Sequence, residues 1–250
     1  MKTLDRCFSI IEVLERNEKM RLQEISDSLN LDKSTVHRFL TKMYKYNFID
    51  RDIETKKYML GLRFLNISSK IISNMEIRNK AKASLDKLLK ITQETVHLGM
   101  LLGNNLIYID KRESSKAIRM YSQIGKTAPL YCTAMGKAIL SQQDKEEIEK
   151  ILSSLNFYKY TPNTIDNKEA LYEEIEKVNK QGYAVDNEEY EKGICCIAAP
   201  IKNYTQKVIG SISITTLSQY KNVNVLKYKD LVIAEAKNIS VSLGYLPEST

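Results

Sequence analysis

The first 60 residues carry three short helical patterns in succession, and this arrangement limits the fold more than any other feature of the chain. Apolar residues recur every three or four positions over residues 4–14, 22–29 and 36–43, which is the period of an amphipathic α-helix. Only three residues, 30–32, separate the second pattern from the third, and the last of them, Asp32, is a candidate N-cap. Two helices joined by so tight a turn predict a helix-turn-helix.

Two short segments beyond the third helix alternate apolar and polar residues. Residues 48–53 read F-I-D-R-D-I, residues 57–60 read K-Y-M-L, and 54–56 form a plausible turn between them. This alternation predicts a small hairpin, or wing, beside the third helix. Another amphipathic helix is expected over residues 62–75, and a helix of this kind needs a partner to cover its apolar stripe. Packing against its own chain is the alternative.

The rest of the chain mixes helices with strands. Strands are expected at 95–102, 106–110, 118–122, 183–186, 194–201 and 208–215, helices at 81–92, 133–140, 144–152, 167–180 and 224–243, and a loop at 125–129. An antiparallel sheet flanked by helices is the most economical α+β architecture for this order of elements.

Composition excludes several classes of protein. Of the 250 residues, 43% are hydrophobic and 28% are charged, which is typical of globular domains. No apolar run approaches the roughly 18 residues of a transmembrane helix, and the N-terminal segment has no apolar signal region, so we expect a cytoplasmic protein. The four cysteines form no CxxC pair and the two histidines have no ligands at metal spacing. We therefore expect reduced thiols, no metal and no cofactor.

Positive charge is concentrated in the helix-turn-helix region. The chain carries a net charge of +7, and residues 33–63 hold eight basic side chains against three acidic ones. Such a patch suits the phosphates of a nucleic acid. On charge alone, a solvated helix face is the alternative interpretation.

Several motifs then occur in a consistent order. They are L-Q-E-I at 22–25, L-D-K-S-T-V-H-R-F-L at 31–40, Y-M-L-G at 58–61, A-P-L-Y-C-T-A-M-G-K-A at 128–138, T-P-N-T at 161–164, G-Y-A-V-D-N-E-E at 182–189 and G-I-C-C-I-A-A-P at 193–200. On these motifs, essentially the whole chain resembles the IclR-type (isocitrate lyase regulator) family of bacterial transcription regulators.

The resemblance implies three parts: a winged helix-turn-helix DNA-binding domain at 1–61, a linker and dimerisation helix at 62–80, and a GAF-like effector-binding domain at 81–250. It also implies a homodimer or homotetramer that binds double-stranded, palindromic operator DNA, as a repressor or an activator. Members of the family sense glyoxylate and pyruvate, aromatic acids, or sugar acids such as 2-keto-3-deoxygluconate. We therefore expect a small organic acid as effector.

The DNA-contacting side chains are expected on the third helix and on the wing. A recognition helix enters the major groove by its N-terminal turns, where it reaches base edges and phosphates. The expected contacts are Lys33, Ser34, Thr35, His37, Arg38, Lys42, Arg51, Lys56 and Lys57. Arg38 suits a bidentate contact with guanine, and the lysines suit phosphate.

The effector is expected between the helix that begins at Thr133 and the sheet. The resemblance places around it Met120, Ala128, Ala134, Met135, Asp186, Ile194, Cys196, Ser213 and Thr215. Strand alternation agrees in part, because it puts Ser213 and Thr215 on one face of their strand and Ile194 and Cys196 on one face of theirs, with Cys195 on the other. At the start of the helix, free N–H groups of residues 134–136 suit a carboxylate.

Two alternatives belong to other classes of protein. Asp186, Glu188 and Glu189 are candidate acid/base groups, but the sequence offers them no partner nucleophile and no known catalytic motif. An enzyme is therefore not expected, and a small-acid metabolic enzyme with a DNA-binding appendage is the alternative. In the other alternative Cys196 is a redox sensor, which burial on an apolar strand disfavours.

Overall fold

The computed structural model describes residues 3–115, 122–218 and 225–246. The chain divides into two compact units, residues 1–74 and 75–250, so the division falls within the segment 62–80 that the sequence assigned to a linker. Each unit has its own hydrophobic core. No helix in the described ranges is both long and apolar enough to cross a membrane.

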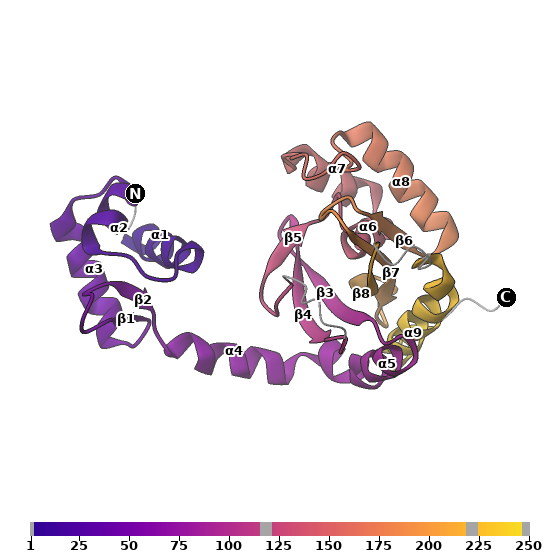
Figure 1. Ribbon diagram of the computed structural model, residues 1–250, viewed down its shortest axis with the longest axis horizontal. Coiled ribbons are helices and arrows are strands. Elements are labelled where there is room, and N and C mark those ends of the chain that lie inside the picture. Colours follow the sequence, from indigo (N-terminus) through magenta and orange to yellow (C-terminus); the bar gives the residue numbers. More distant parts are fainter. Residues whose placement is uncertain (1–2, 116–121, 219–224, 247–250) are drawn as a thin grey trace. The chain divides into compact units, whose positions relative to one another are not determined.

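The N-terminal unit is a winged helix-turn-helix (Figure 1). Its elements are α1 (Thr3–Arg16), α2 (Leu22–Leu29), α3 (Lys33–Lys45), β1 (Ile49–Arg51), β2 (Tyr58–Leu60) and α4 (Arg63–Asn74). Val36, Leu40 and Met43 are buried in a core shared by the first three helices and the wing, as the helical period predicts. Asn30 makes the tight turn in the left-handed conformation, at φ 50°, which Asn adopts more readily than most residues.

The wing is tied to the loop between α1 and α2. The backbone of Met20 exchanges hydrogen bonds with that of Tyr58, at 2.9 and 2.7 Å, and Lys19 Nζ lies 2.8 Å from Asp52 Oδ2. Because β2 pairs with β1 in antiparallel register, both strands are held at a fixed place beside the helices. The wing is therefore a fixed part of the N-terminal unit.

The C-terminal unit is α+β, as predicted. Its elements are α5 (Glu76–Thr92), β3 (Thr95–Leu102), β4 (Asn105–Arg112), β5 (Thr127–Pro129), α6 (Ala134–Leu140), α7 (Lys145–Ser154), α8 (Lys168–Gln181), β6 (Ala184–Asn187), β7 (Ile194–Lys202), β8 (Val208–Leu217), the 3₁₀-helix η1 (Val225–Tyr228) and α9 (Lys229–Ser242). The six strands form one sheet in the order β5-β4-β3-β8-β7-β6, and every neighbouring pair is antiparallel.

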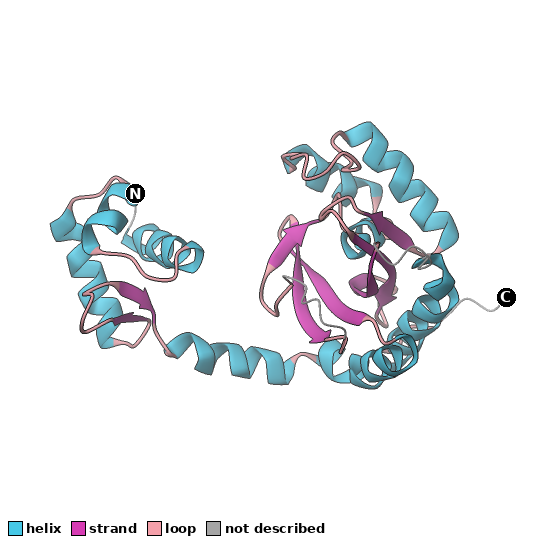
Figure 2. Cartoon of the chain, in the orientation of Figure 1, coloured by secondary structure: helices cyan, strands magenta, loops and turns pink. Residues whose placement is uncertain are grey.

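Each face of this sheet packs against different helices (Figure 2). Helices α5 and α9 cover one face, where Val96, Ile197 and Ile214 belong to their core. Helix α6 covers the other, in a core that also includes residues of α7 and α8. Since successive residues of a strand point to opposite faces, the neighbours of the first group, such as His97 and Ser213, lie on the α6 side.

Two expectations about local structure are wrong. Residues 127–129 were expected in a loop but form β5, where Ala128 pairs with Leu106. Pro129 argued against a strand in the sequence, but a strand at the edge of a sheet tolerates proline. Helix α5 begins at Glu76, well before residue 81. Asp32 occupies the N-cap of α3, as predicted, although its side chain accepts no capping hydrogen bond from the described residues of that helix. The strand expected at 118–122 falls largely outside the described residues, as does the expected helix start at 224.

Helix α6 lies unusually close to the segment that precedes it. A Cβ atom on Gly136 would come within 2.3 Å of the Leu130 carbonyl oxygen and 2.5 Å of its Cα. The first turn of α6 is capped by Thr133, whose Oγ1 accepts a hydrogen bond from the Gly136 N–H at 3.2 Å. A glycine is therefore required for the helix to sit at this depth above the sheet.

We expect Gly136→Ala to lower the free energy of unfolding by about 2–3 kcal/mol, because the added methyl group meets backbone atoms that cannot move aside cheaply. Urea denaturation followed by circular dichroism measures the change. Gly182→Asn is the control: Gly182 ends α8 at φ 80° with open space around it, and Asn tolerates that conformation. Equal stability of Gly136→Ala and the natural chain would contradict the close approach.

Candidate functional site

The surface expected to contact DNA is open to solvent. The nine side chains predicted from the sequence lie on α3 and on the wing, and all are exposed except Thr35 and Lys57, which are half-buried. A groove of about 330 Å³ runs between the two elements. His37 and Thr41 line it from α3, and Arg51 and Lys56 line it from the wing. The sequence prediction missed Thr41 and Ile53, which also border this groove.

The wing tip is organised by Asp52. Its Oδ1 accepts hydrogen bonds from the N–H groups of Glu54 and Thr55, at 3.1 and 2.9 Å. The hydrogen bond from Lys19 is the main reason that the pKa of the Asp52 carboxyl lies well below its ordinary value. The guanidinium group of Arg51 lies 5.1 Å from the centre of the Tyr58 ring. The basic residues of the wing are therefore carried on a structured turn.

The second candidate site is a cavity of about 470 Å³ on the α6 side of the sheet. All six strands contribute to its wall, through Thr127, Tyr108, His97, Ser213, Thr215, Ile194, Cys196 and Asp186. The start of α6 supplies Thr133, Ala134 and Met135, and the loops supply Ser122, Lys126, Tyr160, Tyr190 and Glu191. Polar groups thus meet on a largely apolar surface, which is typical of ligand sites.

Strand register brings several of these residues together. Asp186 pairs with Cys196, which pairs in turn with Thr215. Ser213 pairs with His97 of β3. The sequence prediction grouped Ser213 with Thr215 and Ile194 with Cys196; the register places both pairs on the cavity side, whereas Cys195 belongs to the opposite core.

His97 is held by two hydroxyl groups. Its Nε2 lies 2.8 Å from Ser122 Oγ and its Nδ1 lies 3.2 Å from Thr215 Oγ1. Burial lowers the pKa of His97 from 6.5 to about 3, so the ring is neutral at ordinary pH. Thr215 Oγ1 is also 3.3 Å from Cys196 Sγ. Burial raises the pKa of that thiol well above its ordinary value, which disfavours the reactive thiolate that a redox sensor needs.

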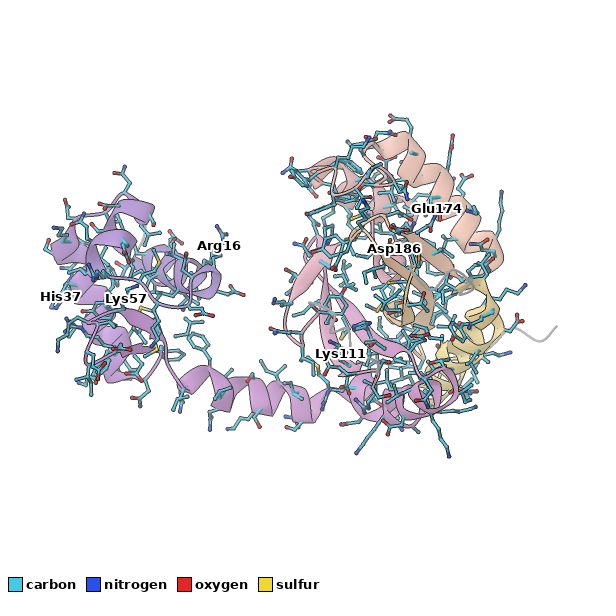
Figure 3. The ribbon with its side chains drawn as sticks, in the orientation of Figure 1. Arg16, His37, Lys57, Lys111, Glu174 and Asp186 are labelled. Atoms are coloured by element: carbon cyan, nitrogen blue, oxygen red, sulfur yellow. The ribbon has the colours of Figure 1, made fainter. Side chains whose placement is uncertain are left out.

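Asp186 lies in the interior of the C-terminal unit (Figure 3) and is 3% exposed. Its Oδ1 accepts a hydrogen bond from the Glu189 N–H at 2.7 Å. Burial is the largest cause that raises the pKa of Asp186 from 3.8 to about 7; the negative charge of Glu189 adds to the rise, while that hydrogen bond and the charge of Lys137 oppose it. The carboxyl group can therefore donate or accept a proton near neutral pH.

The turn after Asp186 is fixed by the T-P-N-T motif. Thr161 Oγ1 donates to the Glu188 carbonyl oxygen and Thr164 Oγ1 donates to that of Glu189, each at 2.6 Å. Within the same turn, Glu189 Oε1 lies 2.6 Å from Lys137 Nζ of α6. This motif and this ion pair therefore hold the wall of the cavity that carries Asp186 and Tyr190.

Seven of the nine residues that the sequence assigned to the effector site line the cavity, namely Ala134, Met135, Asp186, Ile194, Cys196, Ser213 and Thr215. Ala128 is buried on β5 but does not line the cavity, and Met120 lies outside the described residues. The N–H of Gly136 is not free, because Thr133 caps it.

The sequence prediction also missed several lining residues. They are His97, Tyr108, Ser122, Lys126, Thr127, Thr133, Tyr160, Tyr190 and Glu191. Alternation within β3 could have found His97, since its neighbours Val96 and Leu98 belong to the opposite core. The two tyrosines of the loops gave no such signal, because loop residues have no regular period.

Comparison with known proteins agrees with this architecture. Residues 3–52 match the IclR helix-turn-helix domain, and residues 69–241 match the model described as bacterial transcriptional regulator IclR C-terminal. The chain belongs to the IclR family.

Among the described residues, no group of three or more His, Cys, Asp or Glu side chains is placed to hold a metal ion.

The relatives of this IclR-family chain are named as regulators. HTH-type transcriptional regulator KdgR of Dickeya chrysanthemi is 35% identical, over 96% of this chain and 79% of the relative, and KdgR of Escherichia coli is 34% identical, over 96% and 92%. The solved Thermotoga maritima IclR is 32% identical and superposes with a TM-score of 0.74, covering 97% of this chain and 99% of that one. The chain is thus a helix-turn-helix transcription regulator and not an enzyme.

We expect the free energy of unfolding to depend on pH through the protonation of Asp186. Its folded-state pKa of about 7 lies above the ordinary 3.8, so the folded chain retains a proton that the unfolded chain loses. The resulting contribution to stability is fully present below pH 4 and is lost as the pH rises through 7. Between pH 5 and 8, the free energy of unfolding should therefore fall relative to that of Asp186→Asn.

Urea titrations of both proteins at several pH values measure this difference. His97 has the opposite effect, since its lowered pKa makes stability fall as the pH drops below about 6.5. That contribution is common to both proteins and cancels. A difference that stays constant from pH 5 to 8 would mean that Asp186 does not titrate in this range.

Proposed function

We propose that this regulator binds operator DNA through α3 and the wing, and that a small organic acid in the cavity of the C-terminal unit alters that binding. The observation that carries the proposal is the cavity itself, in which Asp186, His97, Ser213 and Thr215 share one wall. A few convergent polar groups on an otherwise apolar wall are typical of small-molecule sites. A ligand with several hydrogen-bonding groups is the natural occupant of such a wall.

A solved relative supports an organic acid as the ligand class. The structure of an IclR homolog from Microbacterium hydrocarbonoxydans is complexed with 4-hydroxybenzoate; it is 21% identical and has a TM-score of 0.82 over 97% of this chain. That likeness concerns the fold, and the assignment of a ligand to this chain depends on its own cavity. An effector acts if it binds two arrangements of the regulator with different affinities and so shifts their populations.

We propose further that two copies pair along α4 and bind an inverted-repeat operator. Helix α4 has no buried residue, although it carries Leu65 and Ile72, which are seven positions apart and so lie on one face of the helix. A second copy of the same stripe would cover these apolar side chains. Paired recognition helices read two half-sites related by a twofold axis, and a tetramer would be a pair of such dimers.

The DNA-binding surface is tested by Arg38→Ala. DNA selected from a random library by the natural protein should contain an inverted repeat, and Arg38→Ala should bind it at least tenfold more weakly, because a bidentate contact with guanine contributes about 1–3 kcal/mol. Fluorescence anisotropy measures the affinity, and circular dichroism checks the fold. Arg16→Ala, an exposed residue at the end of α1, is the matched control for loss of charge. If Arg38→Ala bound the selected DNA as tightly as the natural protein, α3 would not be the helix that recognises the DNA sequence through Arg38.

The effector site is tested by thermal shift. A ligand that binds only the folded state raises the melting temperature, so a screen of keto acids, sugar acids and aromatic acids should find at least one that stabilises the natural protein. Asp186→Ala and Ser213→Ala should abolish that shift, and Ser153→Ala, an exposed residue of α7 away from the cavity wall, should keep it. A shift that survives both cavity substitutions would place the acid elsewhere.

A further inference from the structure

The tip of the wing carries the most exposed large apolar side chain in the described ranges. Ile53 is 83% exposed and lies in the turn between β1 and β2. A single exposed isoleucine is ordinary on a protein surface, so exposure alone assigns it no role. Its position is less ordinary, because the same residue borders the groove between α3 and the wing.

Hydrogen bonds fix the turn that carries Ile53. The Lys56 N–H donates to the Asp52 carbonyl oxygen at 3.0 Å, and the Asp52 N–H donates to the Lys57 carbonyl oxygen at 2.9 Å. Lys56 closes the turn in the left-handed conformation, at φ 57°. The Asp52 carboxylate is held in turn by Lys19 Nζ at 2.8 Å. The isoleucine is therefore presented to solvent by backbone that is ordered before any partner binds, which lowers the entropic cost of binding.

The groove beside the tip has the chemistry of a phosphate site. Thr41 lines it from α3, and Arg51 and Lys56 line it from the wing. Asp52 also lines it, but its carboxylate is paired with Lys19. Hydroxyl and cationic donors are the groups that bind the phosphate oxygens of DNA. A sugar–phosphate strand is thus the natural occupant of this groove.

Duplex DNA has a shape that matches this arrangement. One sugar–phosphate strand separates the wide major groove from the narrow minor groove. When α3 lies in the major groove and that strand lies between α3 and the wing, the tip of the wing is at the minor groove. The exposed Ile53 side chain then faces the bases from that side. In proteins that bind the minor groove, apolar side chains insert at base steps and bend the duplex.

Charge attraction does not explain a contact at the tip itself. Glu54 follows Ile53 and is exposed, and a carboxylate is repelled by phosphate. The positive charges of the wing lie on the groove side, at Arg51 and Lys56. The contribution left to the tip is therefore an apolar one.

We propose that Ile53 inserts into the minor groove beside the bases that α3 contacts, and that it bends the operator there. This inference rests on the proposed DNA-binding surface and extends base recognition to the flanking pairs. An apolar wedge needs an unobstructed groove floor. A·T pairs present only acceptors in the minor groove, whereas a G·C pair adds the amino group at N2 of guanine. The protein should therefore prefer A·T pairs, with an easily unstacked pyrimidine–purine step, next to each half-site.

The test uses the duplex that the natural full chain selects from a random library. The A·T pairs next to each half-site are replaced by G·C, or by inosine·C, which lacks the N2 amino group and so keeps a minor groove like that of A·T. The natural protein should bind the G·C duplex about fivefold or more weakly than the other two. Ile53→Ser should bind all three alike, because the side chain that meets the amino group is gone. Fluorescence anisotropy measures the affinities.

The bend is measured by energy transfer between dyes at the two ends of the duplex. The natural protein should bring the ends closer together, and Ile53→Ser should lose most of that change. Ile53→Val keeps an apolar wedge and should behave as the natural protein does. Glu54→Gln is the control for charge: it should tighten binding to all three duplexes alike. Circular dichroism checks that each variant folds, as substitution of an exposed side chain should allow.

Three results would overturn this role of Ile53. If Ile53→Ser kept the natural discrimination against G·C and the natural bend, the isoleucine would not be the wedge, and DNA binding by α3 would stand. If the natural protein bound the inosine duplex as weakly as the G·C duplex, the flanking pairs would be read from the major groove. If the natural protein selected no duplex, the DNA-binding proposal would fail together with the inference.

Discussion

The ammonium group of Lys137 is the constraint on which the cavity of the C-terminal unit depends. This side chain projects from α6 into the protein interior and is 1% exposed, with Glu189 Oε1 at 2.6 Å and Glu174 Oε1 at 3.6 Å. A buried charge is tolerated only beside a partner, and loss of that partner costs about 3–5 kcal/mol in comparable cases. Helix α6, helix α8 and the turn after β6 must therefore stay together.

The ion pair between Lys137 and Glu189 is linked to the cavity by the turn that follows β6. Glu189 bonds Lys137 through its side chain and Asp186 through its backbone N–H, so one residue links the buried charge to the carboxyl group in the cavity wall. Thr161 and Thr164 fix the same turn from the side of the 157–166 loop. A ligand that contacts Asp186 therefore contacts a turn whose position is shared with two helices.

Much of this architecture could be predicted from the sequence, because it depends on local periodicity. The three-helix pattern with its tight turn identified the winged helix-turn-helix, and alternation placed Ser213 with Thr215, and Ile194 with Cys196, on one face of each strand. What escaped prediction depends on tertiary contacts. Strand β5 forms only because β4 offers it an edge, and Tyr160 and Tyr190 reach the cavity only because distant hydrogen bonds shape their loops. No sequence pattern placed Lys126 at the cavity, because a single lysine in a loop is ordinarily solvated.

The two faces of the sheet place different requirements on the amino-acid sequence. Solved proteins only 20% and 23% identical to this chain still superpose on it with TM-scores of 0.83 and 0.82. The face against α5 and α9 explains this tolerance, because a hydrophobic core requires suitable volume and polarity more than particular residues. The cavity face has the opposite requirement, since recognition needs donors and acceptors at defined positions. The two faces therefore place different constraints on the sequence, and the described part of the cavity face carries a neutral histidine, an aspartate that titrates near neutral pH and three tyrosines.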